Sequence, residues 1–327
     1  MAEWLFEDGI GEARAALVED GHILEAAIAW DDVTWPLGTI TPARIGEIDR
    51  ARRQGFVTLP DGSAAILSPL PPQSISQGSA VTVEITREPI AEGRRGKWPK
   101  ACLTNARPGP APSLRERCDA RPLNALGPDA FETAGWSELI EEAASGEIAF
   151  PGGALHLSIT PAMVLFDVDG TLPRPALAIA GATAAARTIR RLGIGGNIGI
   201  DLPTLENKAE RAAATAAFDA HLPQPFERTA VNGFGFLQII RRKSRRSIPE
   251  MLAQDPVGAA LRLLLRRAER CGGSGAIRLT AAPALIDRLA SRPEWQDQLA
   301  RRTGRTIALQ SDPQVATWGG HAEAQNP

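Results

Sequence analysis

Two aspartates that follow apolar strands have the type and spacing needed for metal chemistry. Asp167 closes the apolar run of residues 163–167, and Asp201 closes the run of residues 197–201. Both runs are nearly all apolar, so we predict two buried neighbouring strands, about 4.8 Å apart in one sheet. Like charges that close need a cation between them, and oxygen-only ligands suit Mg²⁺. The sequence therefore predicts Asp167 and Asp201 as metal ligands and Mg²⁺ as the cofactor.

A third aspartate belongs to the same predicted site. Asp169 lies two residues beyond Asp167, where it could orient a water molecule or support the metal ligands. The simpler alternative is that Asp167 and Asp201 only cap turns or the helices that follow them. Two such residues, each after a buried strand, favour a catalytic site formed by Asp167, Asp201 and Asp169.

The segment Asp-Val-Asp-Gly-Thr at 167–171 also resembles the first motif of the haloacid-dehalogenase-like phosphatases. In that family the first Asp is a nucleophile and the second is a general acid/base. The chemistry also needs a downstream pair of acids, and no such pair follows an apolar strand after residue 202. A lone short motif is a weak signal, so a phosphatase is kept as the less favoured alternative.

Positive charge is local in this chain, whose formal net charge is -2. Residues 241–246 hold five cations, namely Arg241, Arg242, Lys243, Arg245 and Arg246. More arginines follow on an expected helix, namely Arg262, Arg266, Arg267 and Arg270. A charge run is usually a solvated face, so this pattern alone names no partner.

The cysteines and the apolar runs restrict the class of protein. Cys102, Cys118 and Cys271 form no Cys-x-x-Cys pair, so neither a disulfide framework nor a complete zinc site is indicated. The N-terminus lacks the apolar core of a signal peptide, and no apolar run reaches the length of a membrane span. We expect a cytoplasmic, reducing setting and no membrane partner.

The elements that must position these residues predict an α+β protein. Residues 1–35 predict a β-hairpin that turns at 19–21, and short strands at 37–105 predict a five-stranded OB-type barrel. The expected domains are 1–105 (hairpin and barrel), 106–147 (linker and helix), 148–248 (mixed α/β catalytic core), 249–311 (small C-terminal α/β subdomain) and 312–327 (disordered tail).

From about residue 148 the sequence resembles the ribonuclease E/G family of bacterial endoribonucleases, which are specific for single strands. The blocks that carry the resemblance are "FPGGALHLSITPAMVLFDVDG", "AARTIRRLGIGGNIGIDLPTL" and "RTAVNGFGFLQIIRRKSRRSI", with "ERCGGSGAIRL" as a remnant of a zinc link. The barrel at 37–105 is similar to the family's S1-like OB domain. The resemblance implies that the catalytic core is a DNase I-like subdomain.

The resemblance implies a Mg²⁺-dependent endoribonuclease that cleaves single-stranded RNA in RNA processing or decay. Asp167 and Asp201 match the family's metal-binding aspartates, and Asp169 stands where the family has an Asn that positions water or phosphate. Among the expected RNA-binding residues, Phe56, Lys97, Lys100 and Arg228 match or lie near family positions. The others follow from residue type, as aromatic stacking or as cations: Trp98, Arg94, Arg95, the five cations of 241–246, and the arginines after them.

The departures from the family are also informative. The region between barrel and core is short, so the family's ribonuclease-H-like insert and most of its 5′-end sensor are expected to be absent. The acid at position 169 adds negative charge beside the metal, which favours reduced activity. A catalytically weakened RNA-binding regulator is therefore the main alternative function. Only Cys271 remains of the zinc link, so a homodimer stays open but a zinc-linked one is not expected.

Overall fold

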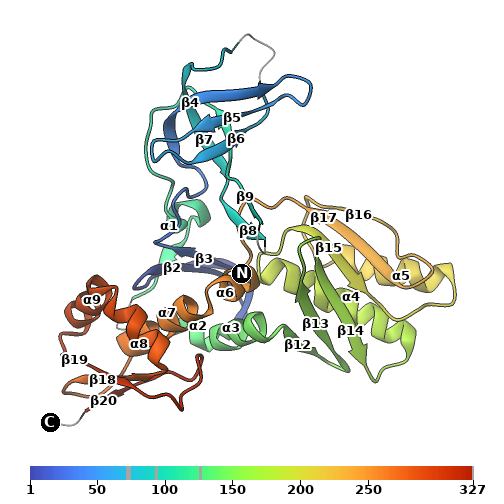
Figure 1. Ribbon diagram of the computed structural model, residues 1–327. Coiled ribbons are helices and arrows are strands. Elements are labelled where there is room, and N and C mark those ends of the chain that lie inside the picture. Colours follow the sequence, from blue (N-terminus) through green and yellow to red (C-terminus); the bar gives the residue numbers. More distant parts are fainter. Residues whose placement is uncertain (71–74, 93–94, 125–126, 326–327) are drawn as a thin grey trace. The chain divides into compact units, whose positions relative to one another are not determined.

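The chain is a mixed α+β protein in the computed structural model, which describes residues 1–70, 75–92, 95–124 and 127–325 (Figure 1). The side chains of residues 91, 92 and 95 lie outside this description. The chain divides into two compact units, and each unit is built from separate stretches of sequence. Unit 1 is Met1–Asp32, Cys118–Ala144 and Ile248–Pro327, and unit 2 is Val33–Arg117 and Ser145–Ser247.

Unit 1 begins with a four-stranded sheet in the order β11-β1-β2-β3. Its strands are β1 (Glu3–Asp8), β2 (Glu12–Glu19), β3 (His22–Trp30) and β11 (Arg121–Pro122). The predicted hairpin is β2–β3, and its two-residue turn is Asp20-Gly21, with φ angles of 50° and 77°. Two positive φ angles are the signature of a type I′ turn, whose twist matches that of the strands. β1 is an additional strand that was not predicted.

The C-terminal part of unit 1 packs helices around a second sheet, in the order β19-β18-β20. Its elements are α6 (Ile248–Gln254), α7 (Pro256–Glu269), β18 (Ile277–Ala281), α8 (Pro283–Ala290), α9 (Pro293–Thr303), β19 (Ile307–Ser311) and β20 (His321–Ala324). Two further helices, α2 (Ala130–Thr133) and α3 (Trp136–Ser145), come from the middle stretch of the chain. The apolar side of α7, with Leu261, Leu264 and Leu265, is fully buried in this core.

Two expected domain boundaries are wrong. The tail after residue 312 is not disordered through its described part, because β20 pairs with β18 and Trp318 and Ala322 pack against the core. The expected 1–105 domain is divided, since the hairpin belongs to unit 1 and the barrel to unit 2. Strand pairing causes this division, because β1 pairs with β11, which lies after the barrel in the chain.

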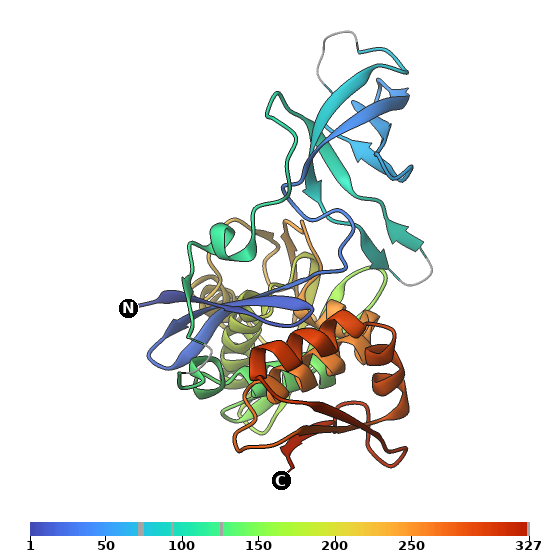
Figure 2. The same ribbon diagram turned by 90° about the vertical axis from the view of Figure 1, so that its left-hand side faces the viewer.

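Unit 2 contains a closed barrel with the strand order β10-β6-β5-β4-β7 (Figure 2). Its strands are β4 (Ile40–Asp49), β5 (Gln54–Thr58), β6 (Ala64–Leu67), β7 (Ala80–Arg87) and β10 (Lys100–Leu103). β10 pairs with β6 in parallel and with β7 antiparallel. The core holds alternate residues such as Ile45, Val57 and Leu67. This architecture is consistent with the predicted OB-like barrel. A small hairpin, β8 (Ile90–Glu92) and β9 (Arg95–Lys97), and α1 (Leu114–Cys118) follow β7 in the chain.

The second part of unit 2 is a six-stranded mixed sheet in the order β12-β13-β14-β15-β17-β16. Its elements are β12 (Glu147–Phe150), β13 (Gly153–Ile159), β14 (Val164–Gly170), α4 (Arg174–Arg191), β15 (Gly196–Asp201), α5 (Lys208–Asp219), β16 (Glu227–Arg228) and β17 (Phe236–Arg241). Only β14 and β15 pair in parallel, because α4 connects them. α4 packs against β13 and β14, and α5 packs against α4 (Figure 1).

The described helices include none with the length and apolar character to cross a membrane.

Candidate functional site

The two predicted metal-binding aspartates are direct partners in the mixed sheet. Asp167 of β14 is opposite Asp201 of β15 in the parallel ladder. The residues that flank them, such as Phe166 and Ile200, are fully buried, whereas both aspartates are exposed. Successive side chains of a strand point to opposite faces, so both carboxylates project from the face that α4 does not cover. With strands about 4.8 Å apart, two carboxylates on one face can share a cation.

Asp169 joins the same face because β14 is longer than the sequence indicated. The strand was expected to end at Asp167, but it continues to Gly170 and keeps pairing with β13. Asp167 and Asp169 are therefore two residues apart in one strand, and both are exposed. The β pairing with Gly153 and Ala154 at the "PGG" turn extends the strand, which a local apolar pattern does not reveal.

A histidine that sequence reasoning missed lies beside these carboxylates. His156 of β13 is opposite Asp167 in the antiparallel ladder, and its Nε2 is 3.7 Å from Oδ2 of Asp169. Glu147 of β12 is opposite His156. The exposed face thus carries the row Glu147, His156, Asp167 and Asp201. The signal in the sequence was the alternation of "ALHLSI", which puts His156 on the polar side of its strand.

The chemistry of this row fits Mg²⁺ better than a metal that is held entirely by protein. Within the described residues no group of three or more His, Cys, Asp or Glu side chains could hold a metal ion. Mg²⁺ usually keeps several waters and is held by one or two carboxylates together with substrate phosphates. Asp167 and Asp201 offer that donor set, because both present only carboxylate oxygens on an exposed surface.

The barrel presents the two predicted stacking aromatics together. Phe56 of β5 and Trp98, just after β9, are 39% and 49% exposed, and their ring centroids are 5.2 Å apart in an edge-on arrangement. A core aromatic was the alternative for Phe56, but its neighbours in β5, Gly55 and Val57, take the buried positions instead. An exposed aromatic pair on an OB-like barrel is a typical surface for stacking unpaired bases.

Two lysines lie near this aromatic pair in the chain or in the strand register, namely Lys97 and Lys100. Lys100 follows Trp98 and is opposite Ile66, which is itself opposite Phe56. Burial, with further contributions from Arg87 and Lys97, lowers the pKa of Lys100. Lys97 is exposed, while Arg94 and the side chain of Arg95 lie outside the described residues.

The loop between β4 and β5 holds three exposed arginines that sequence reasoning missed. They are Arg50, Arg52 and Arg53. This loop follows the first barrel strand, at a position that often contacts oligonucleotides in OB folds. The sequence signal was the "RARR" run before Phe56.

The basic segment 241–246 begins at the other end of β15 from Asp201. Arg241 is opposite Gly196, five residues before Asp201, which is about 17 Å along a strand. Nη1 of Arg241 donates to the carbonyl of Ile194 at 3.0 Å. Arg242 is exposed, and Lys243, Arg245 and Arg246 are partly buried.

Arg228 is not brought to the carboxylates. It is opposite Ile239, which is buried on the side of the sheet that faces the helices. Its guanidinium binds Asp219 of α5, with Nε donating to Oδ1 at 2.9 Å, and this hydrogen bond raises the pKa of Arg228. The structure therefore gives Arg228 an ion-pairing role between β16 and α5 instead of the expected place near the substrate.

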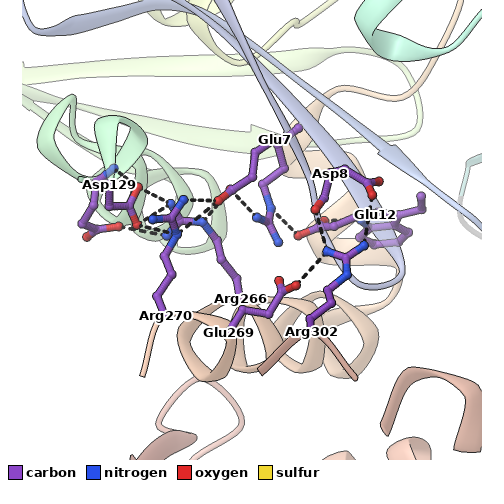
Figure 3. Close-up of polar contacts among 11 residues, drawn as sticks. Glu7, Asp8, Glu12, Asp129, Arg266, Glu269, Arg270 and Arg302 are labelled. Carbon is purple, nitrogen blue, oxygen red and sulfur yellow. Dashed lines mark hydrogen bonds and ion pairs between the residues drawn. The ribbon is translucent and has the colours of Figure 1, made fainter. Parts of the chain in front are cut away.

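Arg262 and Arg266 of α7 require a correction to the sequence interpretation. Arg262 and Arg266 are only 1% and 3% exposed, so neither can hold an RNA backbone. Arg266 binds Glu7 and Asp129, and Arg270 binds Glu7 as well (Figure 3). The spacing of the arginines along the helix did not reveal that acidic residues from β1 and from the loop before α2 pair with these arginines.

Arg262 and Arg267 have other protein partners. Arg262 donates to the carbonyl of Gly11 and lies between the rings of Trp30 and Trp295, at 4.3 and 4.8 Å from their centroids. Arg267 is exposed and donates to the carbonyl of Gly320. The four arginines thus contact groups of unit 1 itself.

No family model matches the sequence, and no curated protein matches it. The interpretation of the site therefore depends on its geometry and on the chemistry of its residues.

Proposed function

We propose that this protein is a Mg²⁺-dependent endoribonuclease that cleaves single-stranded RNA. The observation that carries the proposal is the pairing of Asp167 with Asp201 on one exposed face. The resemblance to the ribonuclease E/G family, with its S1-like barrel and DNase I-like core, belongs to the same proposal. The OB-like barrel with its exposed aromatic pair supports it independently.

In the proposed reaction, Asp167 and Asp201 hold the cation through their carboxylate oxygens. Mg²⁺ bound there supplies a more acidic water and offsets charge on the scissile phosphate. Asp169 accepts a hydrogen bond from the attacking water and so orients it. The water oxygen forms a bond to phosphorus and the P–O3′ bond breaks. The proton that the water loses to solvent is balanced by the proton that the leaving 3′-oxygen takes up, so the products carry a 5′-phosphate and a 3′-hydroxyl.

In the same proposal, RNA binding is shared between stacking and charge. Phe56 and Trp98 stack on unpaired bases, while Lys97, Lys100 and the cations of 241–246 contact phosphates. The phosphate contacts release counterions, so the affinity for RNA decreases steeply as the salt concentration rises. Bases in a duplex are not free to leave their stack, which explains a preference for single strands.

The test is cleavage of a labelled AU-rich single-stranded RNA by the full chain, with Mg²⁺ and then with EDTA. We expect Asp167→Asn and Asp201→Asn each to lower the rate by at least about 100-fold, because each removes one charge from the metal ligands at constant size. Asp287→Asn is the matched control, since Asp287 is exposed on α8 in the other unit. Cleavage that persists in EDTA or in both variants contradicts the proposed site.

The second candidate is an RNA-binding regulator without cleavage. The position of Asp169 favours it, because a third carboxylate on the exposed face increases the repulsion of a phosphate. RNA binding without cleavage in any divalent ion supports the regulator. An Asp169→Asn variant that then cleaves RNA identifies the extra charge as the cause. Hydrolysis of p-nitrophenyl phosphate instead supports the phosphatase alternative.

A further inference from the structure

The most exposed described aromatic ring lies in the turn before β17, next to the candidate catalytic face. Phe234 is 83% exposed. Two residues later, Phe236 is opposite Asp201 in the antiparallel ladder and is partly buried. The turn therefore begins one strand away from the carboxylate pair.

The turn is held firmly although the ring is exposed. Oδ1 of Asn232 accepts hydrogen bonds from the backbone N–H groups of Phe234 and Phe236, at 2.9 and 3.0 Å. The N–H of Leu202, the residue after Asp201, donates to the carbonyl of Gly235 at 3.2 Å. Gly235 has a φ of 95°, and a Cβ there would lie 2.2 Å from the carbonyl oxygen of Leu202. This close approach fixes the turn against the end of β15.

The ring of Phe236 lies over the strand that carries Asp201. A Cβ at Gly199 would be 2.5 Å from the ring of Phe236 and 2.8 Å from Leu165. Gly199 therefore leaves room for two apolar side chains on the exposed face of β15. Leu165 and Gly199 are themselves ladder partners, one pair before Asp167 and Asp201.

Apolar surface and acid thus adjoin on the face of the mixed sheet that α4 does not cover. The exposed ring of Phe234 gains little from burial within the chain, so most of its apolar surface is open to a ligand. A nucleotide carries a planar apolar base close to its phosphate, which matches an aromatic group beside a cation-binding carboxylate pair. Base–aromatic stacking accepts every base and needs an unpaired one.

We propose that Phe234 and Phe236 form a stacking platform that binds an unpaired nucleobase adjacent to the phosphate at Asp167 and Asp201. The identity of the ligand rests on the proposed function. The platform is a binding contribution of the catalytic face itself and is separate from the Phe56–Trp98 pair of the barrel. It selects single strands at the position of cleavage.

The first experiment measures binding without cleavage. Single-stranded RNA with 2-aminopurine at one position at a time is titrated with the full chain in EDTA, and affinity and fluorescence quenching are recorded. We expect Phe234→Ala and Phe234→Leu to weaken binding by roughly 5- to 150-fold and to remove the quenching at one position. Phe234→Trp keeps both. Ile179→Ala is the control, because Ile179 is 41% exposed on α4.

The second experiment uses cleavage of RNA with a single abasic nucleotide in Mg²⁺. For the wild type, one abasic position lowers the cleavage rate. In Phe234→Ala the same position has no further effect, because the partner of the base is already gone. A purely structural role of Phe234 would not produce this dependence on one nucleotide.

Several outcomes overturn the platform. Wild-type affinity of Phe234→Leu excludes stacking, and a Phe234→Ala variant that changes only the sedimentation of the chain shows a contact between two copies instead. Quenching that depends on Phe234 without any cleavage in Mg²⁺ supports the platform and contradicts the endoribonuclease. Normal cleavage by Phe234→Ala on all substrates contradicts the platform and leaves the endoribonuclease supported.

Discussion

Arginines of this chain occupy two kinds of surroundings, and their neighbours decide which. Arg50 and Arg52 are exposed in the loop between β4 and β5 of the barrel, where solvent surrounds their charges. Arg266 is buried between Glu7 and Asp129, where its charge is already compensated. A buried ion pair contributes little net stability, but the loss of one partner is costly because the other charge stays buried.

Glu7 is the residue on which this ion-pair network converges (Figure 3). Burial opposes its ionisation, but Arg14, Arg266 and Arg270 outweigh burial and lower the pKa of Glu7 from 4.5 to about 2. The folded pKa is below the unfolded one, so ionised Glu7 stabilises the protein above about pH 4.5. This contribution, about 3 kcal/mol, is lost as the pH falls from 4.5 to about 2.

The prediction is a loss of acid sensitivity in Glu7→Gln. Urea unfolding of the variant should show a lower free energy of unfolding at pH 7, by about 3 kcal/mol, and a flatter decrease toward pH 2. Burial raises the pKa of nearby Glu269 against the effect of Arg302, so protonation of Glu269 acts in the opposite direction. The difference in the free energy of unfolding between wild type and Glu7→Gln, followed over pH, isolates the contribution of Glu7. Asp20→Asn, in the exposed β2–β3 turn, is the control, and equal slopes for both variants would refute the argument.

At the scale of elements, α4 sets the position of the strand that carries Asp167 and Asp169. Gly181 of α4 lies against Val168, which is between the two aspartates in β14. A Cβ at position 181 would be 2.4 Å from Cγ1 of Val168. The small residues of α4 thus permit close packing on the back of the candidate site, and this packing orients the aspartates outward.

We predict that Gly181→Ala lowers the free energy of unfolding by about 1–3 kcal/mol, because the added methyl overfills the contact with Val168. In a Val168→Ala background the same substitution should lower the free energy of unfolding much less. A double-mutant cycle of urea unfolding measures the coupling between the two positions. Gly109→Ala is the control, since no atom lies within 4 Å of a Cβ there. Additive effects of the two substitutions would show that the contact between positions 181 and 168 does not cause the destabilisation.

At the scale of the whole molecule, each unit is assembled from distant stretches of sequence. Unit 1 needs residues from the N-terminus, the middle and the C-terminus, and the barrel and the mixed sheet of unit 2 are likewise separate in sequence. β20 takes part in this arrangement, because it pairs with β18 and its Ala322 packs against the core.

Removal of residues 313–327 should therefore destabilise unit 1 while the barrel of unit 2 stays folded. Limited proteolysis should cut the truncated protein within α7–α9 much faster than the full chain. Two point variants in β20 serve as a matched pair for this test, because Ala322 packs against the core and Glu323 is exposed. Ala322→Glu should behave like the truncation and Glu323→Ala like the wild type. Equal resistance of the truncated and full chains would indicate that β20 is dispensable.

Much of the local structure was determined by the sequence itself. Alternation and turn residues predicted the β2–β3 hairpin with its Asp20-Gly21 turn, and regular turn spacing predicted the five-stranded barrel. The apolar runs before Asp167 and Asp201 predicted two neighbouring strands of one sheet, and the parallel pairing of β14 with β15 confirms this. The hairpin and its turn depend on neighbouring residues alone, so the sequence contains them.

Only the tertiary structure decided which charges meet. It joined Glu7 and Asp129 to the arginines of α7, moved Arg228 to Asp219, and set His156 opposite Asp167. It also made the tail a strand of the unit 1 core. The physical reason is that an ion pair or a ladder partner is specified by proximity in space. Residues more than 100 positions apart, such as Glu7 and Arg266, carry no local mark of that proximity.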